Sequence, residues 1–206
     1  MGLFDKFKRS NDNPENWIEK RENHYSQMFG PIEENILHSS DVKDVHIDIY
    51  QFAPNADRPF WILATGGMSD LRQPIPEDHE GPAPRAEIFM YADEPSNWMF
   101  NVLKGLAEMP FDYDVYLHWF HTVPNGQPMT AEPSNLTSFF FLPPYFERHE
   151  LSDLKIDGDG VDFLWMIPIT EKEREYAMEK GSQALEEVFE KAGLETILDL
   201  SRDSLV

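Results

Sequence analysis

The sequence predicts an α+β fold in a single domain, with a mainly antiparallel or mixed β-sheet and helices packed on it. Strand-like and helix-like segments follow one another along the chain without a strict β-α-β alternation. The 206 residues, of which 41% are hydrophobic and 13% aromatic, can bury one substantial core but are few for two independent domains. We expect a flexible N-terminal segment over residues 1–13 and one domain over residues 14–206.

The first half of the domain is expected to form one helix and three strands. The helix begins at Pro14, because proline favours the first helical position, and it ends before Gly30. Hydrophobic and polar residues alternate over residues 45–52, which predicts a half-buried strand. Residues 60–64 are almost all apolar and predict a strand covered on both faces, and a further strand is expected over residues 86–91.

The second half continues the mixture of helices and strands. An apolar stripe at helical spacing predicts a helix over about residues 96–108. Aromatic and β-branched residues predict strands over residues 115–123, 135–142 and 163–167. Acidic residues and glycines over residues 157–162 lack the ligand pattern of a calcium loop, so a β-turn between strands is expected there.

Two helices are expected to close the domain. Thr170 and Glu173 have the spacing of a capping box, which predicts a helix that runs to about Lys180. The final helix carries an apolar stripe that includes Leu185, and Gly193 is expected to be its C-terminal cap.

The charge of the chain narrows the classes of partner. Seventeen basic residues stand against thirty-eight acidic ones, which gives a net charge of −21. Such a charge repels phosphate backbones, so nucleic acid is not an expected partner. The acidity either keeps the chain soluble or steers a basic partner toward it, and net charge alone does not decide between the two.

The composition also indicates a compartment. The chain has no cysteine, which excludes disulfides, thiolate catalysis and cysteine-based zinc sites. It shows no secretory signal and no apolar run of the ~20 residues that a membrane-spanning helix needs. We therefore expect a cytoplasmic protein without a membrane span.

The sequence contains only incomplete matches to known catalytic motifs. The segment Gly67–Leu71 is similar to a nucleophile elbow, but Leu71 stands where the second glycine is needed, which favours a glycine-enabled turn. His118 and His121 are expected to point to opposite faces of a strand, which disfavours a shared metal. His46 and Asp48 share a strand face, and we interpret them as a hydrogen-bonded pair. No catalytic, cofactor-binding or metal-ligating residue is therefore predicted.

Three blocks of sequence together resemble the suppressor of fused family. The first block is Asp48–Pro54 followed by Arg58-Pro59-Phe60, and the second is Leu63–Asp70, with its Thr-Gly-Gly-Met-Ser-Asp run, followed by Arg85-x-Glu87. The third is Trp98 and, later, Pro168–Glu175, which reads Pro-Ile-Thr-Glu-Lys-Glu-Arg-Glu. The resemblance covers about residues 44–190.

The resemblance implies a module that binds protein and carries out no chemistry. Animal members of the family bind a transcription factor and have a second, C-terminal domain, whereas bacterial members with this single domain are often interpreted as immunity proteins. The candidate family-motif or partner-binding residues are Thr65, Gly66, Gly67, Met68, Ser69, Asp70, Arg85, Glu87, Tyr116 and Trp119. Tyr113, Phe120 and the run 139–141 are further candidate aromatic anchors, and the Arg85–Glu87 pair is alternatively a tie between loop and sheet.

Two hypotheses about function stay open at this point. The first is a non-enzymatic binding module of the suppressor of fused type, with immunity against a basic toxin or housekeeping regulation as its role. The second is a hydrolase or metal-dependent enzyme that uses the loop Thr65–Asp70 and a histidine such as His118 or His121.

Overall fold

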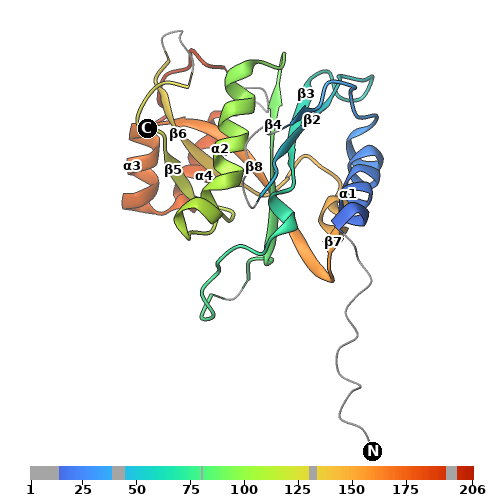
Figure 1. Cartoon of the computed structure of the whole chain (residues 1–206). Coiled ribbons are helices and arrows are strands. Elements are labelled where there is room, and N and C mark those ends of the chain that lie inside the picture. The colour runs from blue at the N-terminus through green and yellow to red at the C-terminus, as the bar shows by residue number, and fades with distance from the viewer. Residues whose placement is uncertain (1–13, 39–44, 80, 130–133, 194–198) are drawn as a thin grey trace, which may run out of the picture.

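The computed structural model describes residues 14–38, 45–79, 81–129, 134–193 and 199–206, so the expected N-terminal segment lies outside the described residues. The helices are α1 (Pro14–Phe29), α2 (Asn97–Tyr113), α3 (Glu171–Lys180) and α4 (Ser182–Ala192), with short 3-10 helices η1 (Met68–Asp70) and η2 (His149–Asp153) (Figure 1). The strands are β1 (Leu37–His38), β2 (Asp48–Phe52), β3 (Trp61–Gly66), β4 (Arg85–Ala92), β5 (Thr122–Pro124), β6 (Leu136–Leu142), β7 (Lys155–Ile156) and β8 (Asp159–Thr170).

The strands of the described residues form one mixed sheet. Their order is β1-β2-β3-β4-β8-β6-β5, and β7 pairs with β8 beside this path. Neighbouring strands run antiparallel except β4 and β8, which are parallel. Together with the four helices, this sheet confirms the predicted α+β fold in a single domain.

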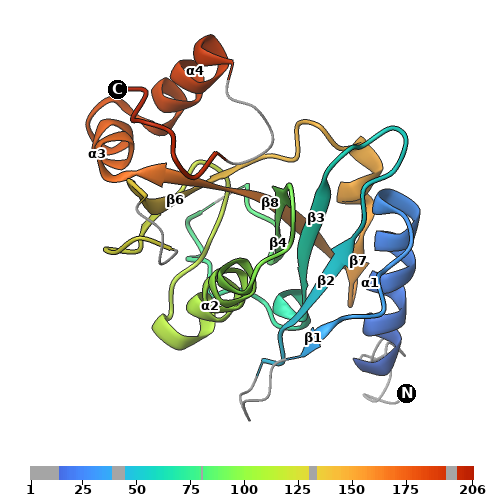
Figure 2. The same cartoon turned by 90° about the horizontal axis from the view of Figure 1, so that it is seen from above.

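Helices cover both faces of the sheet, as Figure 2 shows from above. Helix α2 packs on one face, where Met99 and Leu103 join a core with residues of β2, β3 and β4. On the opposite face, α1 covers β2 and β3, while α3 and α4 cover the part of the sheet with β6 and β8. None of the helices in the described part of the chain is long and apolar enough to cross a membrane.

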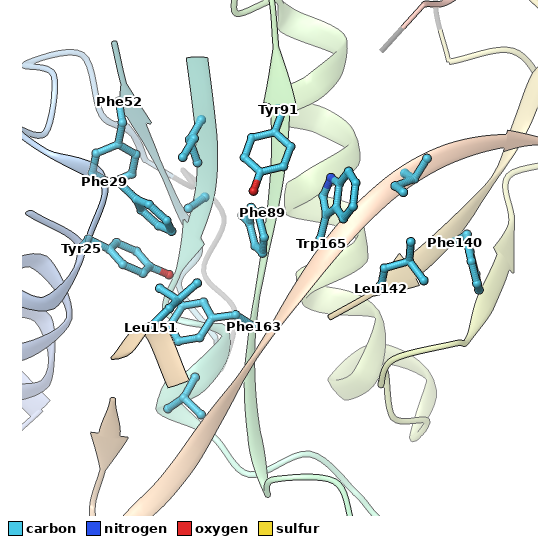
Figure 3. Packing of buried hydrophobic residues seen from close by; sticks show 14 of the residues in the cluster. Tyr25, Phe29, Phe52, Phe89, Tyr91, Phe140, Leu142, Leu151, Phe163 and Trp165 are labelled. Carbon is cyan, nitrogen blue, oxygen red and sulfur yellow. The ribbon is translucent and has the colours of Figure 1, made fainter. Parts of the chain in front are cut away.

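The core under α1 is rich in aromatic side chains (Figure 3). The ring of Tyr25 lies 5.9 Å from that of Phe163 on β8, and the ring of Phe29 lies 5.1 Å from that of Phe52 on β2. All four side chains are buried. Because aromatic rings bury large apolar areas, this contact fixes α1 firmly on the sheet.

Most of the expected elements are present with small shifts in their ends. Helix α1 and the strands β3, β4 and β6 confirm the predicted segments. The segment 45–52 forms a strand only from Asp48, and all five residues of β2 are buried, so the half-buried prediction was wrong. The reason is that α1 and α2 cover the two faces of β2.

The capping predictions are confirmed at the C-terminal helices. The Thr170 hydroxyl accepts a hydrogen bond from the Glu173 N–H at 3.2 Å, and the Glu173 carboxylate accepts one from the Thr170 N–H at 2.8 Å. Gly193 caps α4 with a φ of 65°. Glycine adopts this left-handed conformation without steric cost, which ends the helix.

The predicted strand over residues 115–123 was wrong except at its end, where β5 begins at Thr122. The chain turns at residues 118–121, where the His121 N–H donates to the His118 carbonyl at 3.2 Å. Phe120 has a φ of 68°, which no β-strand accommodates. A high β-propensity was therefore overridden by a local turn.

Strand β8 is longer than expected and passes through Pro168. Pro168 lies opposite Phe139, next to a register shift between Leu136 and Ser138, where a missing N–H disturbs the ladder least. At the other end, Asp157 and Gly158 connect β7 to β8 with φ values of 51° and 85°, which confirms the predicted turn.

Candidate functional site

The carboxylate of Glu87 lies at the centre of a buried polar cluster between β3, β4 and η1. Glu87 has no exposed surface. It accepts hydrogen bonds from the Thr65 hydroxyl at 2.6 Å, the Ser69 hydroxyl at 2.6 Å, and the backbone N–H groups of Gly67 at 3.0 Å and Ser69 at 3.1 Å. A buried charge is tolerated only with such partners, so Glu87 holds the loop after β3 against β4.

The glycine pair of this loop meets two steric demands. A Cβ on Gly66 would lie 2.2 Å from the ring of Tyr50. Gly67 has a φ of 112°, and a Cβ there would lie 2.0 Å from the carbonyl oxygen of His46. Only glycine fits at either position, because the loop passes closely over the start of β2.

Arg21 on α1 supplies the positive charge of the cluster. Its Nη1 donates to the Asp70 carboxylate at 2.7 Å and to the Ser69 hydroxyl at 3.0 Å, and it lies 3.6 Å from the Glu87 carboxylate. Burial alone would lower the pKa of Arg21, but the carboxylates of Glu87 and Asp70 outweigh it and raise this pKa above its ordinary value. The guanidinium therefore stays charged in the core.

Arg21 and Tyr25 also contact the loop of the Glu87 cluster, although neither is among the predicted site residues. The Tyr25 hydroxyl donates to the Thr65 carbonyl at 2.7 Å, and burial raises the pKa of this phenol well above its ordinary value. Arg21 and Tyr25 are four residues apart and share one face of α1. An arginine within an apolar helical stripe was the signal that could have identified them.

Arg85 holds the other side of the loop. Its Nη1 donates to the carbonyl oxygens of Ser69 and Asp70, both at 2.8 Å, and its Nε donates to the Asp159 carboxylate at 2.9 Å. Asp159 also accepts two hydrogen bonds from Arg72, both at 2.7 Å. Burial would raise the pKa of Asp159, but these arginine hydrogen bonds outweigh it and lower that pKa below its usual range.

The residues Tyr116 and Trp119 lie in the segment between α2 and β5, apart from the Glu87 cluster. Both side chains are half-buried. The ring of Tyr116 lies 5.5 Å from that of His79 and 5.0 Å from that of His121. The Trp119 indole donates to the Phe163 carbonyl at 3.0 Å, which fixes this segment to β8.

The loop of the Glu87 cluster and this aromatic segment are joined through Gln73. The Gln73 side chain donates to the Leu117 carbonyl at 3.1 Å and accepts from the Leu117 N–H at 2.8 Å. Gln73 therefore pairs with the segment as a backbone strand would. The ten predicted site residues therefore lie in three places. Tyr116 and Trp119 lie in the surface segment, Met68 is buried in the apolar core with residues of α2, and the other seven lie in or next to the Glu87 cluster. Gln73 connects the cluster to the segment.

The two histidines share a turn instead of opposite strand faces. The rings of His118 and His121 are 6.3 Å apart, and His118 lies 3.3 Å from the Asp162 carboxylate. Burial, together with the nearby His118, lowers the pKa of His121. Among the described residues, no histidine hydrogen-bonds to Ser69 or Asp70.

An open groove runs along the aromatic segment beside β5, the last strand of the sheet path. This aromatic groove has a volume of about 760 Å³ and is lined by Met109, Tyr113, Val115, Tyr116, Leu117, Phe120, His121, Thr122, Val123 and Pro124. The Tyr113 side chain is 74% exposed. The residues 139–141, by contrast, are buried in the core and offer no anchor at the surface.

Known proteins match most of this chain. The family model described as suppressor of fused protein (SUFU) matches residues 43–203. The immunity protein YqcF of Bacillus subtilis (strain 168) is 26% identical over 171 residues, which cover 81% of this chain and 85% of that protein.

Solved structures share the fold. A SUFU homologue from Neisseria gonorrhoeae FA 1090 superposes with a TM-score of 0.74 at 21% identity, over 93% of this chain and 98% of that one. A chain of the Sufu–Fu complex superposes with a TM-score of 0.67 at 16% identity, over 92% of each chain. Drosophila Suppressor of Fused gives a TM-score of 0.58 at 16% identity, over 91% of this chain and 50% of that one.

The family match covers the strands and the loop of the Glu87 cluster, the aromatic segment and both C-terminal helices, whereas Arg21 on α1 lies before the matched residues. It covers most of the chain, and the fold of the solved homologues agrees with it. The protein belongs to the suppressor of fused family.

Proposed function

We propose that this chain is a non-enzymatic binding module that acts in the cytoplasm as an immunity protein and neutralises a basic protein toxin. The observation that carries the proposal is the similarity to immunity protein YqcF, which extends over 81% of this chain. The absence of cysteine from the sequence fits a reducing compartment.

The charge of the chain supports a basic partner. A net charge of −21 on 206 residues produces a negative potential that attracts a cationic protein from a distance. Complementary charge raises the association rate and excludes acidic competitors more than it raises affinity. In this proposal the acidity attracts a basic partner, and an apolar contact is needed to hold that partner once it is bound.

We assign this contact to the aromatic groove. No residue that lines it carries a carboxylate, an ammonium or a guanidinium group. Asp112 and Asp114, on either side of Tyr113 in the chain, are exposed. An apolar centre with aromatic side chains and an acidic rim fits a basic partner that inserts an apolar anchor.

The family-motif residues take a positioning role in this proposal. Glu87 and Arg85 hold the loop from Gly67 to Asp70. Gln73, three residues after Asp70, holds Leu117 in the wall of the groove. The buried cluster thereby sets the shape of the surface that meets the partner.

The geometry of Ser69 supports a function without catalysis. Ser69 has no exposed surface, and its hydroxyl donates to the Glu87 carboxylate at 2.6 Å and accepts from Arg21 at 3.0 Å. A nucleophilic serine needs access to substrate and a neighbouring base. These contacts instead commit the hydroxyl to the core.

A capture experiment tests the proposal. The tagged protein is incubated with lysate of the cells that encode it, at low and at moderate salt, and bound proteins are identified by mass spectrometry. We expect one basic protein at stoichiometric level, and this protein should be toxic when expressed alone and harmless when co-expressed with the present chain. An empty capture at both salt concentrations overturns the binding module, whereas a specific but harmless partner overturns only the immunity role.

Matched variants test the groove separately. Tyr113→Ala and Tyr116→Ala remove aromatic surface from the groove and should weaken capture at least about tenfold, as is typical of an aromatic hot spot. Tyr145→Ala is the control, because Tyr145 is 53% exposed and lies outside the residues that line the groove. Equal capture by all three variants would place the partner on another surface.

A further inference from the structure

Three potential metal ligands gather at the β1 edge of the sheet. His38 on β1 lies directly opposite Asp48 on β2 in the antiparallel ladder, so both side chains point to the same face. His46 precedes Asp48 by two residues and reaches the same carboxylate. The pairing register, rather than proximity along the chain alone, therefore brings two imidazoles to one carboxylate.

The potential ligand atoms of this cluster are close enough together to bind one metal ion. His38 Nδ1 lies 2.7 Å and His46 Nε2 lies 3.0 Å from the same Asp48 oxygen, Oδ1. Ligand atoms of all three residues lie within 4.8 Å of one another. In a tetrahedral zinc site with bonds of about 2.0–2.2 Å, ligand atoms are about 3.3 Å apart, so small side-chain rotations suffice.

The accessibility of the three side chains also suits an ion that enters from solvent. The side chains of His38 and His46 are 63% and 54% exposed, whereas that of Asp48 is 13% exposed. The two imidazole rings are 6.2 Å apart and inclined by only 24°. The carboxylate is thus held by the sheet, and the two imidazoles are free to adjust around an incoming ion.

We propose that His38, His46 and Asp48 bind one zinc-type divalent cation, with water in the remaining position. Two imidazoles and one carboxylate suit Zn²⁺, Ni²⁺ or Cu²⁺ and are a poor set for Ca²⁺ or Mg²⁺, which require more oxygen ligands. The negative charge of the chain raises the local concentration of cations. The bound ion joins the two-residue strand β1 to β2 and secures this edge of the sheet.

Isothermal titration of the metal-free protein with Zn²⁺ alone tests the site. We expect one ion per chain and a rise in the melting temperature on addition of Zn²⁺. The variants His38→Ala, His46→Ala and Asp48→Asn should each weaken binding by about 10- to 100-fold or more, since each removes or neutralises a ligand. The same variants should lose the rise in melting temperature.

His149→Ala is the matched control, because the His149 side chain is 91% exposed and lies on η2, away from the cluster. Circular dichroism and the melting temperature without Zn²⁺ establish that each variant is folded, and His38 and His46 are exposed enough to be replaced without loss of core packing. The proposal is overturned if the wild type binds no Zn²⁺, or if the three ligand variants bind it as tightly as the control.

Discussion

Among single residues, Glu87 contributes most to the structure of the candidate site, because its buried carboxylate holds the loop after β3 in place. Its four hydrogen-bond donors come from Thr65, Gly67 and Ser69, and Arg21 approaches from a different element. A buried ion pair is weak evidence for stability by itself, since dehydration offsets much of the attraction. Removal of one partner of the pair is strongly destabilising, because the polar groups that remain stay buried without a hydrogen-bond partner.

The variant Glu87→Ala should therefore lower the free energy of unfolding by about 3–5 kcal/mol, the range for a broken buried ion pair. Glu87→Gln should cost less, since an amide oxygen still accepts some of the bonds. Urea unfolding monitored by tryptophan fluorescence measures both effects. Glu77→Ala, at an exposed loop position, is the control, and a cost for Glu87→Ala below about 1 kcal/mol would contradict a structural role for the cluster.

Part of the Glu87 cluster can be predicted from the sequence. The residues that cannot be predicted all join it through contacts between distant segments. Gly66, Gly67 and Glu87 can be singled out from the sequence because they belong to a local motif, whereas Arg21 lies 66 positions before Glu87 and joins the cluster only through the packing of α1. The same holds for His38, which joins His46 and Asp48 only through the register of β1 on β2. Contacts between distant segments depend on tertiary packing, which one sequence does not show.

At the scale of elements, β3, β4 and α3 were predictable because apolar runs and capping residues are local signals. The segment before β5 was not predictable, since a turn with Phe120 at positive φ looks like a strand in composition. The strands β1 and β7 have two residues each and carry no periodicity to recognise. Helices and strands could therefore not be predicted where tertiary contacts, and not local propensity, determine the backbone conformation.

Helix α3 also contributes to stability through the charge on Glu173. Burial would raise the pKa of this carboxyl, but hydrogen bonds from Arg202 and from the Thr170 N–H outweigh it and lower the pKa below its ordinary value of 4.5. The folded state therefore favours the ionised form more than the unfolded state does. The resulting stability is present above the unfolded pKa and is lost as the pH falls through the lower folded pKa.

The variant Glu173→Gln should consequently be less stable than the wild type by about 2–3 kcal/mol at neutral pH, because hydrogen bonds to charged groups contribute about 1.5–3 kcal/mol. The difference should shrink as the pH is lowered below about 4.5. Urea unfolding at several pH values between 7 and 3 measures it. Glu175→Gln, at an exposed position of the same helix, should show no such trend, and a difference for Glu173→Gln that is constant with pH would refute the assignment.

At the scale of the whole molecule, the excess of acidic residues is a property of the surface and not of the fold. The excess of acidic residues is visible in the sequence, but the aromatic groove proposed to bind the partner is not, because a turn whose composition is typical of a strand forms it. In the proposed function, the charge and the groove together select a cationic partner that inserts an apolar anchor.

The association rate with the captured partner should fall by about tenfold or more when NaCl is raised from ~20 mM to ~500 mM, because salt screens the steering field. The dissociation rate should change much less, since the apolar groove holds the complex once it has formed. Stopped-flow or surface-plasmon measurements separate the two rates. An association rate independent of salt would remove electrostatic steering from the proposed function.

The parallel pairing of β4 with β8 has a consequence for synthesis on the ribosome. Strand β4 ends at Ala92, but its neighbour β8 begins only at Asp159, so a growing chain makes one side of the central pair long before the other. At roughly 5–20 residues per second, the open edge of β4 persists for several seconds. We expect this nascent intermediate to be the stage at which the protein depends most on chaperones, because the open edge of an apolar central strand invites aggregation.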